Sequence, residues 1–426
     1  MSNPATGASN VRIAVIGAGI VGTAIAFELR RRGADVVLVD RGEPGGACSA
    51  GNSGAISPSS VTPLAMPGVL KSVPGMLLDR DGPLYLPLGY LPTALPWLLK
   101  FTASARPDIV AETARRLGDL HSGAVQMHEA MTRSLGVAEL FLHRGHLHLY
   151  RDDTALAADA TGWRMREQYG FRCERLDRAG IDALEPGVAP DYRVAMFMPD
   201  QATILNPKRY VQVMARAFAD AGGVIVQADV RALRRDGVRW RLAGDASRAE
   251  GSPEVTRSDA SRSLLGADAA FDHAIVAAGA WSRALLDPLD IRLALEAQRG
   301  YHVQFHGAND AVSRTVVLTD YKLFFTPMEE GLRVGGTVEI AGLKRPPDPR
   351  RSAQLERIAR QVFPRLEGLE STPWMGHRPC MPDTMPVVGR TPGHDGLWLA
   401  VGHGHLGLTD SLPTAQRIAD GILGRR

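Results

Sequence analysis

The sequence is short of the residues and patterns that mark several special classes of protein. It has only three cysteines in 426 residues, so we expect no disulfide framework and a reducing compartment. It has no uninterrupted apolar run of about 18 residues, so no membrane-spanning helix is expected. Its formal net charge is only +3, which is too balanced to indicate a nucleic-acid partner. The first ten residues contain no Lys or Arg, so we expect no signal peptide.

The rest of the composition is typical of a soluble globular protein, with 45% hydrophobic and 22% charged residues. A chain of this length can bury a large core and is expected to form about two domains. Together with the low cysteine content, these features favour a cytoplasmic location.

The strongest motif lies near the start of the chain. Residues 11–16 form an apolar run that predicts a buried strand. Gly17, Gly19 and Gly22 follow in G-x-G-x-x-G spacing, and then come a predicted helix and a second strand that ends at Asp40. Strand, glycines, helix, strand and acid occur in the order of a dinucleotide-binding β-α-β unit. The alternative is a tightly packed β-α-β unit that binds no ligand.

Each residue of this motif has a physical role in binding a dinucleotide. Gly17 permits the tight turn, Gly19 lets the backbone approach a pyrophosphate, and Gly22 lets the helix pack closely on the strand. The helix start offers unpaired N–H groups and the positive end of the dipole to the pyrophosphate. Asp40 is placed to accept hydrogen bonds from ribose hydroxyls.

Two more glycine-rich turns indicate a cofactor larger than NAD. Residues 41–60 form a Gly/Ser/Asn-rich loop with many free backbone donors, for which a plain surface loop is the alternative. Residues 402–407 read GHGHLG between a short strand and the last predicted helix, 408–423. A helix that begins there would direct its positive end at an electron-rich group, such as the N1–C2=O edge of a flavin. This pairing favours FAD over NAD.

The region 62–101 is apolar and repeatedly broken by proline, so a long helix is not expected there. It is interpreted as a lid, as a peripheral membrane contact with 95–101 as a short interfacial piece, or as a segment packed on its own protein. Residues 108–135 predict one amphipathic helix with Asp108 as its N-cap. Asn206 and the proline after it predict the start of a further helix.

The second half of the chain predicts a different kind of sheet. Residues 298–305, 315–319, 323–328 and 332–340 alternate like antiparallel strands. Residues 140–150 alternate like a strand pair around Gly145; the histidines there could form a zinc site, but no acid or cysteine stands at ligand spacing, so no metal is expected. Residues 239–268 predict a hairpin with a long exposed loop. Residues 372–390 are punctuated by proline and predict a loop.

Several motifs together give the chain a family resemblance. VIGAGIVG, SAGNSGAISP, IVAAGAW, GHRPCMPDTMPVVG and GHGHLGLT span nearly the whole chain. In this order they resemble the D-amino-acid oxidase superfamily of FAD-dependent oxidoreductases, and D-amino-acid dehydrogenases most. The resemblance implies an α/β fold with a Rossmann-like FAD-binding domain of the GR2 type (10–95, 205–290 and 365–426). It also implies an inserted α+β substrate domain built on an antiparallel sheet (96–204 and 291–364).

The resemblance further implies oxidative deamination of a D-amino acid, such as a proline-like one. A hydride would pass from Cα to flavin N5, and the electrons would go to a quinone or another acceptor. A protein of this kind is cytoplasmic or lies peripherally on the inner face of the cytoplasmic membrane. The alternatives are an oxygen-using oxidase of sarcosine-like secondary amines and a non-catalytic flavin-binding accessory subunit.

By the same resemblance, a set of motif residues is expected to bind FAD. These are Gly17, Gly19, Ile20, Val21, Gly22, Asp40, Arg41, Ser49, Asn52, Ser53, Gly54, Val230, Ala278, Gly279, Gly404, Leu406, Gly407, Leu408 and Thr409.

Three further residues are implied at the reaction centre. Arg378 matches the position of the family's carboxylate anchor, and the planar fork of arginine suits bidentate pairing with a carboxylate, with a structural salt bridge as the alternative. Tyr321 would cover the substrate or bond its carboxylate, or would have a packing role instead. His405 replaces the small residue expected there, so it would shape the pocket or contact the flavin. Tyr301 and His302 lie on a strand that could reach the pocket.

Two cysteines lie near this region. Some amine oxidases of the superfamily attach FAD through a cysteine near the position of Cys380. The spacing around Cys380 departs from that pattern, so FAD is expected to be bound without a covalent link. Cys48 is expected to have a packing role.

Overall fold

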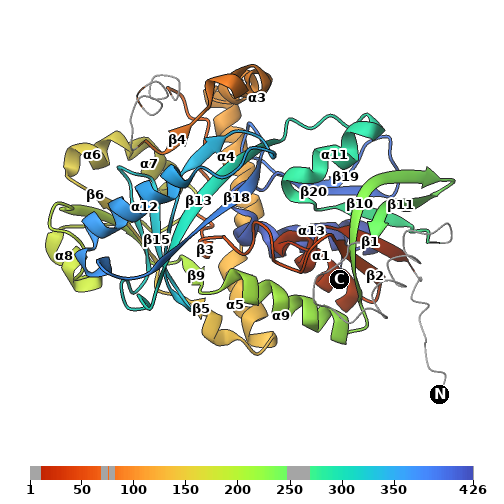
Figure 1. Cartoon of the computed structure of the whole chain (residues 1–426), viewed down its shortest axis with the longest axis horizontal. Helices are drawn as coiled ribbons and strands as arrows, with labels where there is room; N and C mark the ends of the chain where they lie inside the picture. Colours follow the sequence, from red (N-terminus) through yellow and green to blue (C-terminus); the bar gives the residue numbers. More distant parts are fainter. Residues whose placement is uncertain (1–10, 69–74, 76–81, 247–268, 426) are drawn as a thin grey trace.

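The computed structural model describes residues 11–68, 75, 82–246 and 269–425. Two large sheets lie at opposite ends of the long axis of the molecule, with helices between and around them (Figure 1). A small third sheet pairs β3 (Ala55–Ile56) and β5 (Phe141–Leu142) with β9 (Ala202–Ile204).

The first sheet has seven strands in the order β11-β10-β2-β1-β12-β20-β19. Its five inner strands run parallel, and the two edge strands are antiparallel to their neighbours. The bounds are β1 Arg12–Ile16, β2 Asp35–Asp40, β10 Val224–Asp236, β11 Arg239–Ala246, β12 His273–Val276, β19 Val387–Arg390 and β20 Leu397–Val401. The predicted β-α-β unit is therefore confirmed at the centre of a parallel sheet.

Helices cover one face of this sheet. They are α1 (Ile20–Arg31), α9 (Pro207–Asp220) and α13 (Gly407–Leu423), with α5 (Ala124–Ser134) behind them. The other face packs on the β10–β11 hairpin and α11 (Ser282–Leu286). The Asn206 cap is confirmed, because its side chain accepts a hydrogen bond from the N–H of Arg209. A strand at the start of the predicted hairpin 239–268 is confirmed, but it is β11 and pairs with β10, which lies before that range. The rest of the predicted hairpin and its loop lies outside the described residues.

The second sheet has ten strands, nine of them in the order β4-β17-β13-β16-β15-β14-β6-β8-β7, with β18 also paired to β13. The bounds are β4 Leu84–Tyr85, β6 His146–Tyr150, β7 Glu174–Leu176, β8 Val194–Met198, β13 Glu296–His306, β14 Thr315–Leu318, β15 Leu323–Met328, β16 Gly331–Gly335, β17 Val338–Ile340 and β18 Ser371–Cys380. The predicted antiparallel pairing is confirmed for β13 to β16. The domain ranges remain a prediction, although β4 and β18 pair in this sheet.

The two faces of the second sheet have different surroundings because side chains alternate along a strand. One set of side chains, including Leu147, Val316, Phe325 and Val334, packs against α12 (Pro349–Val362). The alternate set faces the interior of the molecule, towards the first sheet. The remaining helices are α3 Leu91–Ala103, α4 Pro107–His121, α6 Asp153–Ala158, α7 Ala160–Gln168 and α8 Arg178–Leu184. Short 3₁₀ turns lie at Leu88–Tyr90, Ala138–Leu140, Gly279–Trp281, Asp287–Leu289 and Pro364–Leu366.

The prediction of a loop over 372–390 was wrong at both ends, because residues 372–380 belong to β18 and residues 387–390 form β19. Strand β18 pairs antiparallel with β13 over ten residue pairs. Its prolines misled the interpretation, since proline is tolerated where a strand has a neighbour on one side only. Within the described residues the only strand that β18 pairs with is β13. The other edge of β18 has no neighbouring strand there, so Pro373 and Pro379, which lack an N–H, need no hydrogen bond on that side.

Four helix or strand predictions also need correction. The helix expected over 108–135 is two helices, α4 and α5, because Gly123 takes a left-handed conformation (φ 74°) and turns the chain between them. Helix α4 begins with Pro107, and Asp108 lies in its first turn. Helix α3 runs for 13 residues although it contains Pro96. The pair expected around Gly145 does not form, since β5 and β6 belong to different sheets.

Candidate functional site: a cavity between the two sheets

The turn between β1 and α1 brings backbone atoms into very close contact. Gly17 has a φ of 109°, and a Cβ atom on it would lie 2.3 Å from the carbonyl oxygen of Ala277. A Cβ on Gly22 would lie 1.8 Å from the carbonyl oxygen of Gly17. No other residue type fits these two positions without moving the backbone. The turn and packing roles of the glycines therefore follow directly from the geometry.

Side-chain hydrogen bonds fix the turn that leads into α1. The hydroxyl of Ser49 accepts the N–H of Ile20 at 2.9 Å. The carboxylate of Asp40 accepts the N–H groups of Ala18 at 2.6 Å and of Gly42 at 2.9 Å, while it faces the cavity. Because a carboxylate has about four acceptor sites, Asp40 can still bond a hydroxyl of a ligand.

One cavity of about 1590 Å³ runs from this turn to the second sheet. Most of the residues expected to bind FAD line it: Gly17, Gly19, Ile20, Val21, Asp40, Arg41, Ser49, Asn52, Ser53, Val230, Ala278, Gly279, Gly404, Leu406, Gly407 and Leu408. Gly22, Gly54 and Thr409 do not line it. Gly54 approaches the carbonyl of Ile204 instead, and the hydroxyl of Thr409 accepts the N–H of Ser57. These three residues therefore lie behind the residues that line the cavity.

The far end of this lining is the start of α13. Gly404 has a φ of 55°, and no side chain caps α13, so the first N–H groups of the helix stay free of side-chain partners where its start lines the cavity. Helix α4 supports the helix from behind, since Nε2 of His121 lies 3.1 Å from Oδ1 of Asp410, with both side chains buried. Helix α5 does the same, because Nε2 of His128 lies 2.9 Å from the carbonyl oxygen of Leu408.

These features fit FAD. Two helix starts, α1 and α13, lie at separate places along one cavity, and each presents backbone donors where anionic or electron-rich groups can bind. At the start of α1, a single added Cβ atom on Gly17 or Gly22 would collide with the backbone. A dinucleotide with a flavin at one end needs both, whereas a simple nucleotide would use only one.

Strand β18 joins the second sheet to this cofactor site. Cys380 forms an isolated β-bridge with His403, and the N–H of Gly404 donates to the carbonyl of Pro379 at 2.8 Å. On the other side, the thiol of Cys48 lies 2.9 Å from the carbonyl oxygen of His377. These contacts fix Arg378 beside the start of α13.

Arg378 is a cation held away from water without an acidic partner among the described residues. Its guanidinium crosses β13 above Gly300, where a Cβ would lie 2.1 Å from Cζ. Its one protein hydrogen bond in the described part of the chain runs from Nη1 to the carbonyl of Thr337 at 2.9 Å. Burial lowers the pKa of Arg378. The free edge of the guanidinium faces the cavity and can bind a carboxylate in bidentate fashion.

A row of side chains on the second sheet forms the opposite wall. Strand register aligns His148, Val317, Phe324, Gly335, His302 and Trp374 across six strands, and all six line the cavity. The rings of His302 and Trp374 stack with centroids 4.9 Å apart. Trp374 also packs where a Cβ on Gly51 would stand, so this wall contacts the glycine-rich loop of the cofactor site.

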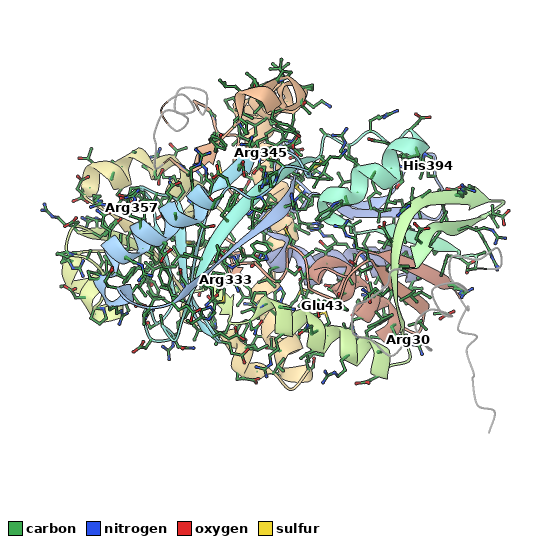
Figure 2. All side chains as sticks on the ribbon, in the orientation of Figure 1. Arg30, Glu43, Arg333, Arg345, Arg357 and His394 are labelled. Carbon is green, nitrogen blue, oxygen red and sulfur yellow. The ribbon has the colours of Figure 1, made fainter. Side chains whose placement is uncertain are left out.

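Arg333 connects the same loop to the sheet and lies near the middle of the molecule (Figure 2). It donates to the carbonyls of Ala50 and Asn52 and to the side-chain oxygen of Gln304. Burial lowers its pKa to about 10. Its donors are satisfied by the protein, which distinguishes it from Arg378.

The histidines of the cavity are neutral at pH 7. Burial, followed by the charge of Arg378, lowers the pKa of His405 to about 4. Burial, followed by Arg333 and Arg378, lowers that of His302 to about 3. The side chain of His405 is open only to the cavity, so its exposed surface is available to a ligand rather than to bulk water.

The structure does not bring Tyr321 to this cavity. Its ring packs against the core between the second sheet and α12, and it is absent from the lining. The hydroxyl of Tyr301 is also committed elsewhere, because it bonds Glu339 at 2.5 Å in a buried group with Arg299. Sequence reasoning missed Trp374, Gly300 and Thr337, whose roles depend on strand register and leave no local signal.

The cysteines are poorly suited to nucleophilic attack. Burial raises the pKa of Cys48, which lines the cavity, to about 11, and that of Cys380 to about 12. All three cysteines are free thiols. Among the described residues, no group of three or more His, Cys, Asp or Glu side chains is arranged to hold a metal ion. In the same residues, no helix has both the length and the apolar character needed to span a bilayer.

The chain belongs to the FAD-dependent oxidoreductase family named DAO, whose model matches residues 12–421. FAD is therefore the cofactor of this protein. A D-amino-acid oxidase from Bradyrhizobium diazoefficiens is 35% identical over 421 residues, which is 97% of this chain and 95% of that protein. A D-amino acid dehydrogenase 2 from Ralstonia nicotianae is 34% identical over 98% of this chain and 97% of its own length.

Solved structures share the fold at low sequence identity. The glycine oxidase from Geobacillus kaustophilus superposes with a TM-score of 0.72 at 19% identity, covering 98% of this chain and 96% of that one. The iminodiacetate oxidase from a Chelativorans species gives 0.69 at 22% identity, with 97% and 96% covered. These likenesses confirm the fold of a Rossmann-like FAD-binding part joined to a second, largely antiparallel sheet.

Proposed function

We propose that this protein catalyses the FAD-dependent oxidative deamination of D-amino acids. The observation that carries the proposal is Arg378, a buried guanidinium without an acidic partner in the described chain, placed beside the start of α13. A buried cation needs a counter-charge, and the free edge of this one faces the substrate part of the cavity. The α-carboxylate of an amino acid supplies that charge.

The residues of the chain would position the substrate rather than exchange protons with it. Arg378 would hold the carboxylate, and His302 and Trp374 would limit the space above the reacting carbon. When bound, FAD supplies the two-electron acceptor for the hydride that leaves Cα. The product imine is hydrolysed by water to a keto acid and ammonia. A substrate amine that arrives neutral needs no general base, which agrees with the neutral histidines of the cavity.

Anaerobic reduction of the flavin tests the function directly. The purified yellow protein would be mixed with D-, L- and N-methyl amino acids, proline and hydroxyproline included, while flavin absorbance is followed. We expect D-amino acids to bleach the flavin and their L-enantiomers to leave it oxidised. Bleaching by N-methyl or L-compounds alone would contradict the proposal and favour a secondary-amine oxidase.

Substitution of Arg378 tests the anchor. Arg378→Ala is expected to lower kcat/KM for D-amino acids by roughly 2–5 kcal/mol of transition-state binding, because one partner of a buried charge pair is lost. Arg378→Lys keeps the charge without the planar fork and should recover only part of the activity. Both variants should retain FAD. An unchanged kcat/KM in Arg378→Ala would refute the anchor.

We further propose that the electrons pass to a quinone and that α3 makes a peripheral membrane contact. The segment 88–99 carries exposed leucines: Leu88, Leu91, Leu95 and Leu99. Leu91 also lines the cavity, together with Trp97 and Leu98 of the same helix. An apolar acceptor could therefore move between a bilayer and the cavity along apolar side chains.

Vesicle binding tests the membrane contact. Wild type is expected to sediment with lipid vesicles, and Leu95→Glu with Leu99→Glu should abolish this without changing anaerobic flavin reduction. A water-soluble quinone should reoxidise the enzyme faster than oxygen does. Rapid peroxide formation with oxygen, or equal sedimentation of the variant, would contradict this part of the proposal.

A further inference from the structure

The cavity extends well beyond the neighbourhood of Arg378. Its volume of about 1590 Å³ includes the space assigned above to FAD, and its lining continues past Arg378 along the second sheet. The end remote from α13 is formed by β6, α7 and the turn between β14 and β15. Its lining there includes His148, Tyr150, Trp163, Arg166 and Lys322. This end is therefore polar and aromatic, and it carries positive charge.

Arg166 is a second desolvated guanidinium in the same cavity. Its Cζ atom lies 4.6 Å from the centroid of the Trp163 ring, so the aromatic face supports the cation. Burial lowers the pKa of Arg166. Within the described chain its guanidinium makes no hydrogen bond and no ion pair. As with Arg378, an arginine in this state is prepared for an anion that none of the described residues supplies.

The nearest carboxylate is already engaged. Oδ2 of Asp159 accepts the hydroxyl of Tyr150 at 3.0 Å, and the same hydroxyl accepts Nε1 of Trp163 at 2.8 Å. Nζ of Lys322 lies 3.8 Å from Asp159. The cluster of Arg166, Lys322 and Asp159 consequently keeps one uncompensated positive charge at the cavity wall.

His148 shows that this charge is directed into the cavity. It lies on the row of sheet residues that face the interior, and its ring meets Trp163 edge-on at 5.2 Å. Burial lowers its pKa well below the usual value, and the charges of Arg166 and Lys322 lower it further. Neutral His148 therefore leaves Arg166 as the cation that an incoming anion would meet.

The two guanidiniums lie far apart. Arg378 crosses β13, and His148 lies on β6, which is four strands away in the order β13-β16-β15-β14-β6. At about 4.8 Å per step the backbones are roughly 19 Å apart, and side chains that lean into the cavity shorten this distance. The carboxylates of aspartate or glutamate are too close together to reach both.

We propose that Arg166 forms a second anion subsite, so that the preferred substrate is an α-amino acid whose long side chain ends in a carboxylate. The α-carboxylate binds Arg378 and the terminal carboxylate binds Arg166, with the apolar chain along Val317 and Phe324. This inference rests on the proposed function, since it assigns the substrate class of the same site.

A chain-length series tests the subsite. D-2-aminodicarboxylic acids of increasing length would be compared with uncharged D-amino acids of equal length in anaerobic flavin reduction. For wild type, the ratio of kcat/KM for acid over neutral substrate should rise with length. Arg166→Gln should reduce the ratio for the best acid roughly thirtyfold and leave the neutral substrate within about twofold.

A matched control lies on the same helix. Arg164 is exposed, and its one described side-chain contact is with Thr161, so Arg164→Gln should leave the ratio unchanged. Arg166→Lys keeps a cation and should retain part of the preference, which provides a second variant if Arg166→Gln folds poorly. Straight-chain dicarboxylic acids, which cannot be oxidised, should bind the FAD-loaded protein more weakly in Arg166→Gln when measured by calorimetry.

The outcomes separate the two proposals. If no D-amino acid reduces the flavin, the proposed function fails. If neutral D-amino acids reduce it but the acids gain nothing with length, only the second subsite fails. Equal losses for acid and neutral substrates in Arg166→Gln would assign Arg166 a purely structural role and overturn the inference.

Discussion

The two halves of the cavity wall are built on different principles. The cofactor half uses the backbone: a glycine turn, two helix starts and a glycine-rich loop present N–H groups to the ligand. The substrate half uses side chains in register across a sheet, with a guanidinium at each end. The first half therefore depends on conformations that few residues can adopt, whereas the second can change its side chains and keep its fold.

The largest expected effect is in the backbone half. Gly17→Ala would place a Cβ 2.3 Å from the carbonyl oxygen of Ala277 at a φ of 109°. We expect a cost on the order of 5 kcal/mol and a protein purified largely without FAD. Gly33→Ala is the control, because Gly33 has a similar φ of 97° with no atom within 4 Å of the added Cβ. Equal FAD content in both variants would contradict the close-approach role.

The next effect is at the support of α13. His121→Leu would leave the carboxylate of Asp410 buried without its partner, 3.1 Å away in the wild type. We expect a loss of about 3–5 kcal/mol in the free energy of unfolding, measured with urea. Adding Asp410→Leu should restore part of it in a double-mutant cycle. Strictly additive losses would show that the pair does not couple α4 to α13.

A smaller effect is a pH dependence carried by His128. Burial lowers its pKa from 6.5 to about 4, so the unfolded chain takes up a proton at a higher pH than the folded one. Its contribution to stability is complete above pH 6.5 and is lost as the pH falls towards 4, by about 3 kcal/mol. Denaturation at pH 7 and pH 5 should show a smaller drop in His128→Gln than in wild type. An identical drop would contradict the assignment.

The smallest effect is expected at Tyr321. Since its ring packs against the core and does not line the cavity, Tyr321→Phe should change kcat/KM by less than about twofold. Steady-state kinetics with the best D-amino acid would measure it. A tenfold loss would return Tyr321 to the substrate site and require the turn after β14 to move on binding.

The difference between the backbone-built and the side-chain-built parts of the cavity wall also decides how much could be predicted from the sequence. Gly17, Gly22 and the start of α13 were found because their roles depend on neighbours a few residues away in the chain. The row from His148 to Trp374 was missed because it exists only when six strands pair in one register. Strand β18 was mistaken for a loop because its prolines are compatible with an edge strand, which the sequence alone does not reveal.

Arg378 is an intermediate case. The family motif predicts it as the carboxylate anchor, but the physical reason for that proposal, a buried cation with one carbonyl contact in the described chain, needed the structure. Arg166 carries no motif at all. Its position over Trp163 and its lack of a partner within the described residues can be seen only in the three-dimensional structure, where it lines the cavity.

The most direct measurement compares a D-amino acid with the amine that lacks its carboxylate, in wild type and Arg378→Ala. Both would be followed by anaerobic stopped-flow reduction of the flavin. The account predicts that wild type strongly prefers the amino acid, and that Arg378→Ala loses this preference while the amine reacts at an unchanged rate. A preference that survives the substitution would show that another group binds the carboxylate, and the central assignment would be wrong.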